Sequence, residues 1–159
     1  MNIGILKEIK AQENRVSMVP GTVADLVKRG HRMIVQSGAG EGASYSDDQY
    51  IAHGAELVPD AAAVFGEAEL IVKVKEPQPS EVARLSPRHI LFTYLHLAAD
   101  QALTESLVAT GCTAIAYETI EVQRRLPLLE PMSEIADRMS AIVGYCLAKA
   151  VGKSMKSNS

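Results

Sequence analysis

The sequence Leu70-Ile71-Val72-Lys73-Val74-Lys75-Glu76-Pro77 joins a short apolar run to an abrupt stop. Leu70–Val74 has the length and β-branched content of a strand that is buried on both faces, as strands of parallel sheets are. Pro77 favours an end to the strand, because proline donates no backbone hydrogen bond and restricts the residue before it. The stretch therefore predicts a buried strand that presents Lys75 at its carboxyl end.

Five other runs of similar length are predicted strands, and segments with helical spacing separate most of them. The runs are Asn2–Leu6, Arg32–Gln36, Glu56–Val58, Ile90–Thr93 and Thr113–Tyr117. Alternation of strands and helices is typical of proteins with a right-handed parallel sheet. We therefore predict an α/β fold, a Rossmann-like or flavodoxin-like parallel sheet that is flanked by helices.

Three helices between the predicted strands have recognisable ends. Thr22–Arg29 is closed by Gly30, since glycine tolerates the left-handed conformation that a helix end often needs. The run Ser46-Asp47-Asp48-Gln49 has the form of a capping box, which starts the second helix. A third helix is expected over Asp100–Thr110, where Gly111 stops it.

The chain has 159 residues, 47% of them hydrophobic and 22% charged, which suits one ordinary globular domain. Its formal charge of −3 and its scattered basic residues disfavour nucleic acid as a partner. No segment approaches the roughly 20 apolar residues of a membrane span, and the first residues do not resemble a signal peptide. Neither cysteine has metal-ligand spacing. We expect a cytoplasmic protein that acts on small molecules, with no membrane, nucleic acid or metal involved.

The alternation of strands and helices ends after Glu118. A charged, proline-containing connection follows, and a long C-terminal helix is predicted to open at Ser133. The expected organisation is an N-terminal domain at 1–130, an interdomain helix at 131–150 and a polar tail at 151–159. The helix carries an apolar stripe that needs a partner surface, so a homo-oligomer formed through Ile135, Met139 and Ile142 is expected.

Chemically active side chains follow three of the predicted strands. The charged run Lys7–Arg15 follows the first strand, Lys75 ends the strand quoted above, and His96 comes just after Ile90–Thr93. Carboxyl ends of parallel strands meet at one edge of an open α/β sheet, where ligands usually bind. An arginine that grips a carboxylate, a lysine that polarises a carbonyl and a histidine that moves protons suit a small oxo or amino acid. Arg15, Lys75 and His96 are therefore the candidate site, although the charged run alone is equally typical of a solvated loop.

The glycine-rich run Gly38-Ala39-Gly40-Glu41-Gly42-Ala43 fits the loose pattern of a dinucleotide-binding turn, with Asp60 about 20 residues on. That pattern needs a helix that begins within the glycines, whereas the capping box starts the helix after Ser46. We therefore interpret the run as a flexible loop. The other histidines are expected at the surface or at helix ends; they are His31, His53 and His89.

Five runs of the sequence occur together and can be compared as a set. They are Lys7-Glu8-Ile9-Lys10 through Arg15-Val16, Ser37-Gly38-Ala39-Gly40, Val72-Lys73-Val74-Lys75-Glu76-Pro77, Tyr94-Leu95-His96-Leu97-Ala98 and Pro131-Met132-Ser133-Glu134. In order and spacing the set resembles bacterial alanine dehydrogenase over about residues 1–148, and five joint matches are far more specific than one motif. The related proton-pumping transhydrogenases share the arginine loop, the glycine loop and the lysine strand, but the run at 94–98 is typical of the alanine enzymes.

The resemblance implies roles for particular residues. Arg15 and Lys75 would bind the carboxylate and carbonyl of pyruvate, and His96 would be the acid-base group. Met132 and Ser133 would face the nicotinamide side of the cleft. The implied reaction converts L-alanine, NAD and water to pyruvate, ammonia and NADH, in a family that forms hexamers.

Members of that family continue from the long helix into a Rossmann domain with its own glycine fingerprint and a catalytic aspartate. This sequence ends after Gly152-Lys153-Ser154 and a few polar residues, so we expect a truncated chain that lacks the NAD-binding domain and is inactive alone. Two alternatives stay open. One is a non-catalytic module that binds an oxo acid through Arg15 and Lys75, and the other is a transhydrogenase-like subunit that needs a separate nucleotide-binding chain.

Overall fold

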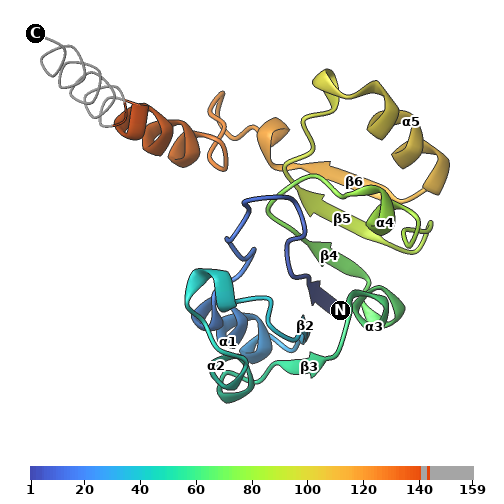
Figure 1. Ribbon diagram of the computed structural model, residues 1–159, viewed down its shortest axis with the longest axis vertical. Helices are drawn as coiled ribbons and strands as arrows, with labels where there is room; N and C mark the ends of the chain where they lie inside the picture. Colours follow the sequence, from blue (N-terminus) through green and yellow to red (C-terminus); the bar gives the residue numbers. More distant parts are fainter. Residues whose placement is uncertain (141–142, 144–159) are drawn as a thin grey trace, which may run out of the picture. The chain divides into compact units, whose positions relative to one another are not determined.

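A six-stranded parallel sheet forms the centre of the fold (Figure 1). The computed structural model describes residues 1–140 and 143 of the chain. Its strands lie in the order β3-β2-β1-β4-β5-β6, and every neighbouring pair is parallel. The strands are β1 (Asn2–Ile5), β2 (Arg32–Gln36), β3 (Glu56–Val58), β4 (Leu70–Val72), β5 (Ile90–Thr93) and β6 (Thr113–Ala116). The predicted α/β Rossmann-like fold is confirmed.

Five α-helices connect the strands, and three short 3-10 helices accompany them. The α-helices are α1 (Pro20–Lys28), α2 (Asp47–Ala52), α3 (Ala61–Glu67), α4 (Pro79–Val82) and α5 (Gln101–Thr110). The 3-10 helices are η1 (Glu41–Ala43), η2 (Leu97–Ala99) and η3 (Tyr117–Thr119). Helices α3 and α4 were not predicted from the sequence. Their start signals are present, since the Asp60 side chain accepts from the third amide of α3 and Gln78 with Glu81 forms a capping box at α4.

The ends of the predicted elements are mostly correct. The capping box at Ser46 is formed and starts α2, and Gly30 and Gly111 close α1 and α5 in the left-handed conformation. The first helix begins earlier than predicted, at Pro20, because proline lacks the amide that the first turn leaves unused and its fixed φ suits that position. Asp100 caps α5 from outside the helix.

Strand β4 is shorter than the predicted Leu70–Val74 and ends at Val72. The reason is that the amide of Val74 donates to the Glu8 carboxylate at 2.6 Å rather than to a neighbouring strand. The strands predicted at Asn2–Leu6 and Thr113–Tyr117 are each one residue shorter in the structure. All three strands end early at the carboxyl edge of the sheet, where a side chain can take the place of a neighbouring strand as hydrogen-bond partner.

The order of the strands creates a switch point between β1 and β4. From β1 the chain winds outward through β2 and β3, then returns to the other side of β1 and continues through β4, β5 and β6. The connections that leave β1 and β4 therefore diverge to opposite sides of the sheet and open a crevice at their carboxyl ends. This edge carries the loops that contain Arg15 and Lys75.

Apolar side chains fill both faces of the sheet. Helices α3, α4 and α5 cover one face through Val64, Val82 and Leu107, and α1 and α2 cover the other through Val23 and Tyr50. The two faces alternate along β2, where Met33 and Val35 belong to one cluster and Ile34 to the other; this is the period of two of a β-strand. The sheet is thus buried on both sides at its centre.

A buried ion triad fastens the carboxyl edge of the sheet. The Lys73 ammonium, just beyond β4, donates to Glu8 Oε2 at 3.0 Å and to Glu81 Oε1 at 2.8 Å. All three side chains are 4% exposed or less. Glu8 belongs to the loop after β1 and Glu81 to α4, so one cation joins three elements. The other oxygen of each carboxylate accepts a backbone amide, from Val74 and Gln78.

The described residues from Glu118 onward belong to a second unit. Val122 and Arg125 pair across a tight turn, in which Gln123 and Arg124 have φ values of 52° and 62°, as a type I′ turn needs. A helix follows over residues 130–140, so it starts three residues before the predicted Ser133. Pro131 in its first turn explains the earlier start.

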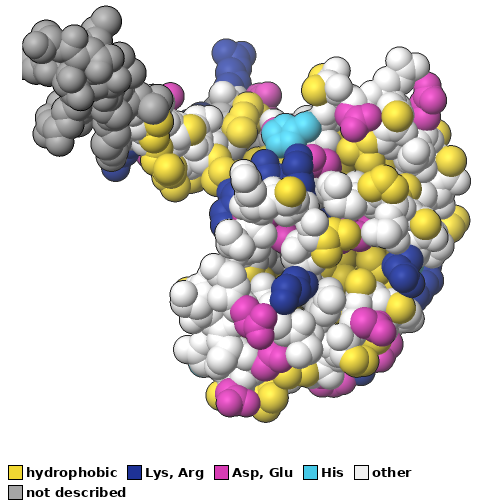
Figure 2. Space-filling view, in the orientation of Figure 1, with side chains coloured by type: hydrophobic (Ala, Val, Ile, Leu, Met, Phe, Trp, Pro, Cys, Tyr) yellow, Lys and Arg dark blue, Asp and Glu magenta, His cyan; other side chains and the backbone are white. Residues whose placement is uncertain are grey.

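The helix of the second unit exposes apolar side chains, and Figure 2 shows hydrophobic side chains gathered along it. Ile135 is 55% exposed and Met139 is 57% exposed. The predicted contact residue Ile142 and the predicted tail at 151–159 lie outside the described residues. Within the described part of the chain, no helix combines the length and the apolar character that crossing a membrane requires.

We expect Gly4→Ala to lower the free energy of unfolding by about 1–3 kcal/mol. A Cβ at Gly4 would lie 2.6 Å from Val64 Cγ1 and 2.8 Å from Ala68 Cβ, so β1 and α3 would have to separate. Gly66→Ala is the matched control, since nothing lies within 4 Å of its added Cβ and alanine favours the helix by roughly 0.5–1 kcal/mol. Urea unfolding measures both, and equal destabilisation would contradict the packing argument.

We expect Lys73→Met to lower the free energy of unfolding by about 3–5 kcal/mol, because it leaves two carboxylates buried without their cation. Lys28→Met is the control. The Lys28 ammonium pairs with Asp25 at 3.8 Å on the surface, and the loss of that pair should cost less than about 1 kcal/mol. Urea denaturation of wild type and both variants measures the difference. Similar midpoints for both variants would show that the buried triad stabilises the fold no more than the surface pair does.

Candidate functional site

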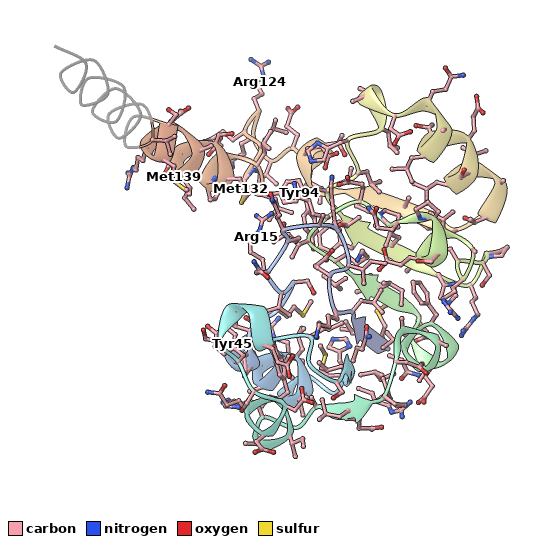
Figure 3. All side chains as sticks on the ribbon, viewed as in Figure 1. Arg15, Tyr45, Tyr94, Arg124, Met132 and Met139 are labelled. Atoms are coloured by element: carbon pink, nitrogen blue, oxygen red, sulfur yellow. The ribbon has the colours of Figure 1, made fainter. Side chains whose placement is uncertain are left out.

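The three predicted site residues all lie beyond the carboxyl ends of neighbouring strands. Arg15 lies in the loop after β1, Lys75 follows β4 and His96 follows β5. The strands β1, β4 and β5 are adjacent in the sheet, so these segments share one edge. Figure 3 shows Arg15 and Tyr94 at this edge, whereas Tyr45 lies farther away, near α2. The expected crevice therefore carries the expected residue types.

The loop that carries Arg15 is fixed by several contacts. Its turn places Gln12 in the left-handed region, at φ 65°, and the Glu13 amide donates to the Lys10 carbonyl at 3.1 Å. The Ser17 hydroxyl donates to the Val72 carbonyl at 2.9 Å, which ties the loop to β4. Gly42 packs so closely on Asn14 that a Cβ there would lie 2.7 Å from the Asn14 carbonyl oxygen.

Arg15 holds a carboxylate that belongs to the chain itself. Its Nε donates to Glu13 Oε1 at 2.8 Å and its Nη2 donates to Glu13 Oε2 at 2.5 Å, a two-pronged pair. Hydrogen bonding to Arg15 lowers the pKa of Glu13 to about 2, and the charge of Lys75 also lowers it. Glu13 is thus ionised near neutral pH, and both predicted substrate-binding cations act on its carboxylate.

Lys75 is held through its backbone, and the residue is only half-buried. Its carbonyl accepts from the Thr93 hydroxyl at 2.8 Å, and its amide points at Glu8 Oε1 at 3.5 Å. Because Glu8 is fixed in the buried triad with Lys73, the position of Lys75 depends on that triad.

His96 is exposed and has an unusual backbone conformation. Its φ of 52° and ψ of 33° lie in the left-handed region, which few residues other than glycine adopt. Its ring stacks on Tyr94, with 6.0 Å between ring centroids and 12° between planes. An uncommon backbone conformation just past the carboxyl end of β5 is the kind of observation that suggests a functional position.

Aromatic residues that were not among the predicted site residues support this edge. Tyr117 packs edge-on against Tyr94 and Phe92, with ring centroids 4.9 Å and 4.3 Å apart. Its hydroxyl donates to the Lys73 carbonyl at 3.0 Å, and burial raises the pKa of Tyr117 above its usual range. The Tyr94 ring thus contacts both Tyr117 and His96.

Glu8 and Glu13 were not predicted as site residues, and only one feature of the sequence could have indicated them. Both occur in the charged run after the first strand, which we treated as a possible solvated loop. Nothing in that run distinguishes a carboxylate that turns inward from one that faces water. Glu8 turns out to be 2% exposed and Glu13 to be 8% exposed, by side chain.

The prediction for His89 was wrong, because this histidine is buried rather than at the surface. It is 2% exposed, its Nδ1 accepts from the Ser86 amide at 3.0 Å, and its Nε2 lies 2.9 Å from the Phe65 carbonyl. These bonds connect the start of β5 with α3, so His89 stabilises the fold. His53 ends α2 as predicted, and His31 is half-buried.

The glycine-rich loop does not suit a dinucleotide. No α-helix starts within it, since α2 begins at Asp47 and only η1 lies among the glycines. A Cβ at Gly40 would lie 2.7 Å from the Tyr50 ring, so this glycine allows close packing within the protein instead of close approach of a phosphate. The Asp60 side chain caps α3. The loop packs closely against Tyr50 and Asn14. This packing does not support the prediction that the loop is flexible.

A cavity of about 220 Å³ adjoins Arg15 at the crevice. Its lining includes Glu13, Arg15 and Lys7, with Gly38 and Gly42 on the side of the glycine loop. The volume is adequate for a small organic acid and small for a dinucleotide. In the part of the chain that the structure describes, no group of three or more histidine, cysteine or acidic residues could hold a metal ion.

Met132 and Ser133 belong to the second unit, which is separate from the unit that holds Arg15, Lys75 and His96. Ser133 lines a hollow of about 370 Å³ that residues 124–137 form. Its amide donates to the Leu129 carbonyl at 3.1 Å, as does that of Met132. Their role on the nicotinamide side of the cleft stays a prediction.

The chain is similar to alanine dehydrogenases over most of its length. It is 53% identical to the alanine dehydrogenase of Halomonas elongata over 154 residues, which cover 96% of this chain and 42% of that protein. It is 49% identical to the Bacillus subtilis alanine dehydrogenase over 144 residues, 91% of this chain and 38% of that protein. The chain thus spans about two fifths of the length of these relatives.

Solved structures give the same result. The structure of an L-alanine dehydrogenase matches with a TM-score of 0.87 and 50% identity, over 91% of this chain and 40% of that one. A transhydrogenase from Sinorhizobium meliloti matches with a TM-score of 0.71 and 25% identity, over 78% and 37%. The family model described as "Alanine dehydrogenase/PNT, N-terminal domain" matches residues 4–136. The chain therefore belongs to the alanine dehydrogenase/PNT family and carries its N-terminal domain.

Proposed function

We propose that the chain is the substrate-binding part of an alanine dehydrogenase, and that its crevice binds pyruvate or L-alanine. The observation that carries this proposal is the environment of the Glu13 carboxylate. Arg15 holds it with two hydrogen bonds, and the charge of Lys75 acts on it as well. A guanidinium that holds a carboxylate with two hydrogen bonds, with a lysine charge that favours the same carboxylate, suits a small oxo acid.

Each proposed role follows from the chemistry of the side chain. Arg15 would hold the substrate carboxylate in its planar fork, which a lysine does not reproduce. Lys75 would stabilise the negative charge that develops on the carbonyl oxygen. His96 would take up and return a proton, since an imidazole ordinarily titrates near neutrality. The exposed ring of His96 leaves it accessible to a substrate in the crevice.

The overall reaction would convert L-alanine, NAD and water to pyruvate, ammonia and NADH. A nicotinamide cofactor would accept the hydride. Because the glycine loop does not suit a dinucleotide, the proposal gives the described residues of the first unit only substrate binding and proton transfer. Met132 and Ser133 are proposed to approach the nicotinamide, on the strength of the resemblance alone.

Two alternatives are weaker. A transhydrogenase-like subunit is less favoured because identity to the transhydrogenase is 25%, against 50% to the L-alanine dehydrogenase structure. A non-catalytic oxo-acid module would use the same Arg15 and Lys75. The exposed His96 favours chemistry over binding alone, since binding a carboxylate needs no acid-base group.

The remaining parts of the proposal concern organisation and surroundings. We propose a substrate-binding domain over 1–130, an interdomain helix over 131–150, a cytoplasmic location and a homo-oligomeric state. The exposed Ile135 and Met139 support the last point, because apolar side chains in a row on one helix favour association. Chromatography with light scattering tests the oligomer.

Pyruvate titration by calorimetry tests the substrate site. We expect wild-type protein to bind pyruvate with a dissociation constant on the order of millimolar, and Lys75→Ala to bind it at least tenfold more weakly, a loss of about 1.4 kcal/mol. Arg15→Lys should also weaken binding, because it keeps the charge and loses the two-pronged fork.

Lys28→Ala is the matched control for the titration. This lysine is exposed on α1 and pairs only loosely with Asp25, so its loss should leave pyruvate affinity unchanged. Equal weakening in Lys28→Ala and Lys75→Ala would mean that general charge, not the crevice, attracts the ligand. Wild-type affinity in Lys75→Ala would overturn the proposed role of this lysine.

A further inference from the structure

The Glu13 carboxylate has the same relation to Arg15 that an incoming carboxylate would need. Both of its oxygens accept hydrogen bonds from the guanidinium, one from Nε and one from Nη2. This is the parallel, two-pronged geometry in which arginine holds a carboxylate most strongly. A substrate carboxylate that seeks this edge of the guanidinium finds it already in use.

Backbone hydrogen bonds and a tight turn hold Glu13 in this position. The turn at residues 10–13 returns the chain, with Gln12 in the left-handed region and the Glu13 amide bonded to the Lys10 carbonyl. Glu13 Oε1 also accepts the backbone amide of Arg15 at 2.9 Å. The Glu13 side chain is only 8% exposed, whereas Arg15 is 43% exposed. The internal carboxylate is therefore the inner partner, and the guanidinium is the one that a solute reaches.

Charge strengthens the comparison with a substrate. The charge of Lys75 also lowers the pKa of Glu13, though less than the hydrogen bonds from Arg15 do. The cavity at Arg15 is also lined by Glu13, which means that a ligand there meets this negative charge directly. A carboxylate ligand must then either displace Glu13 or bind beside it against electrostatic repulsion.

We propose that Glu13 is an internal competitor for Arg15, a carboxylate that substrate must displace and that thereby sets the affinity and carboxylate selectivity of the crevice. The inference rests on the proposed function, since it concerns the same substrate site. Only a ligand with a carboxylate replaces the two hydrogen bonds that Glu13 accepts from the Arg15 guanidinium. Ligands without a carboxylate are disfavoured, because they leave Glu13 in place.

The variant Glu13→Gln tests the proposal, because glutamine keeps the shape of the side chain and removes its charge. We expect pyruvate to bind about tenfold more tightly than to wild type, measured by calorimetry. Pyruvamide, which lacks the carboxylate, should gain nothing. A second measurement needs no substrate: phenylglyoxal modifies arginine, and peptide mass spectrometry gives the rate at which Arg15 reacts. This rate should rise several-fold in Glu13→Gln.

Glu56→Gln is the matched control. Glu56 holds Arg32 with the same pair of bonds, at 2.8 Å and 2.5 Å, but at the amino ends of β2 and β3. Pyruvate affinity should be unchanged in this variant, and a gain there would overturn the proposal as a general charge effect.

The remaining outcomes separate the competitor from the proposed function. Weaker pyruvate binding by Glu13→Gln would overturn the competitor and make Glu13 a residue that positions Arg15. Unchanged affinity and unchanged Arg15 modification would also overturn it, while pyruvate binding by wild type would still support the proposed function. A third outcome is that Arg15 is modified faster in Glu13→Gln while neither wild type nor the variant binds pyruvate. This outcome would overturn the proposed function, and with it the proposal that Glu13 competes with substrate.

Discussion

The ammonium of Lys73 lies between the carboxylates of Glu8 and Glu81, and the carboxyl edge of the sheet depends on this triad. Three charges that are almost fully excluded from water persist together only if each has its partners, because an unpaired buried charge is very costly. The loop after β1, the end of β4 and the start of α4 are thereby held in one arrangement. The strands that meet there are the ones whose loops carry Arg15 and Lys75.

The triad also explains why two lysines that follow β4 differ in burial. Lys73 and Lys75 are two residues apart, yet Lys73 is fully buried in an ion cluster and Lys75 is half-buried. The Glu8 carboxylate contacts both lysines, since one oxygen binds the Lys73 ammonium and the other accepts the amides of Val74 and Lys75. The buried Lys73 thus holds the framework together, and Lys75 is attached to it through its backbone.

Close packing, and not a phosphate, accounts for the glycines near the crevice. Gly40 and Gly42 give space to Tyr50 and Asn14, so the glycine loop supports the loop of Arg15. The relation to alanine dehydrogenases covers 96% of this chain and 42% of the Halomonas elongata protein. The first unit thus has a cavity of about 220 Å³ beside Arg15, and its glycine loop does not form a cradle for a dinucleotide.

The sequence by itself determined the strands, the parallel α/β fold and the candidate residues Arg15, Lys75 and His96. Apolar runs, caps and stops are local signals, and residues at strand ends inherit their location from the fold, so neighbouring residues suffice to predict them. The tertiary structure alone decided which carboxylates turn inward. Glu8 pairs with Lys73 across 65 residues, and its charged run is identical in appearance to a solvated loop. His89 was misplaced for the same reason, because its burial depends on Phe65 and Ser86 and not on its position before a strand. Burial and ion pairing arise from contacts that are distant in the chain, and local sequence carries no record of them.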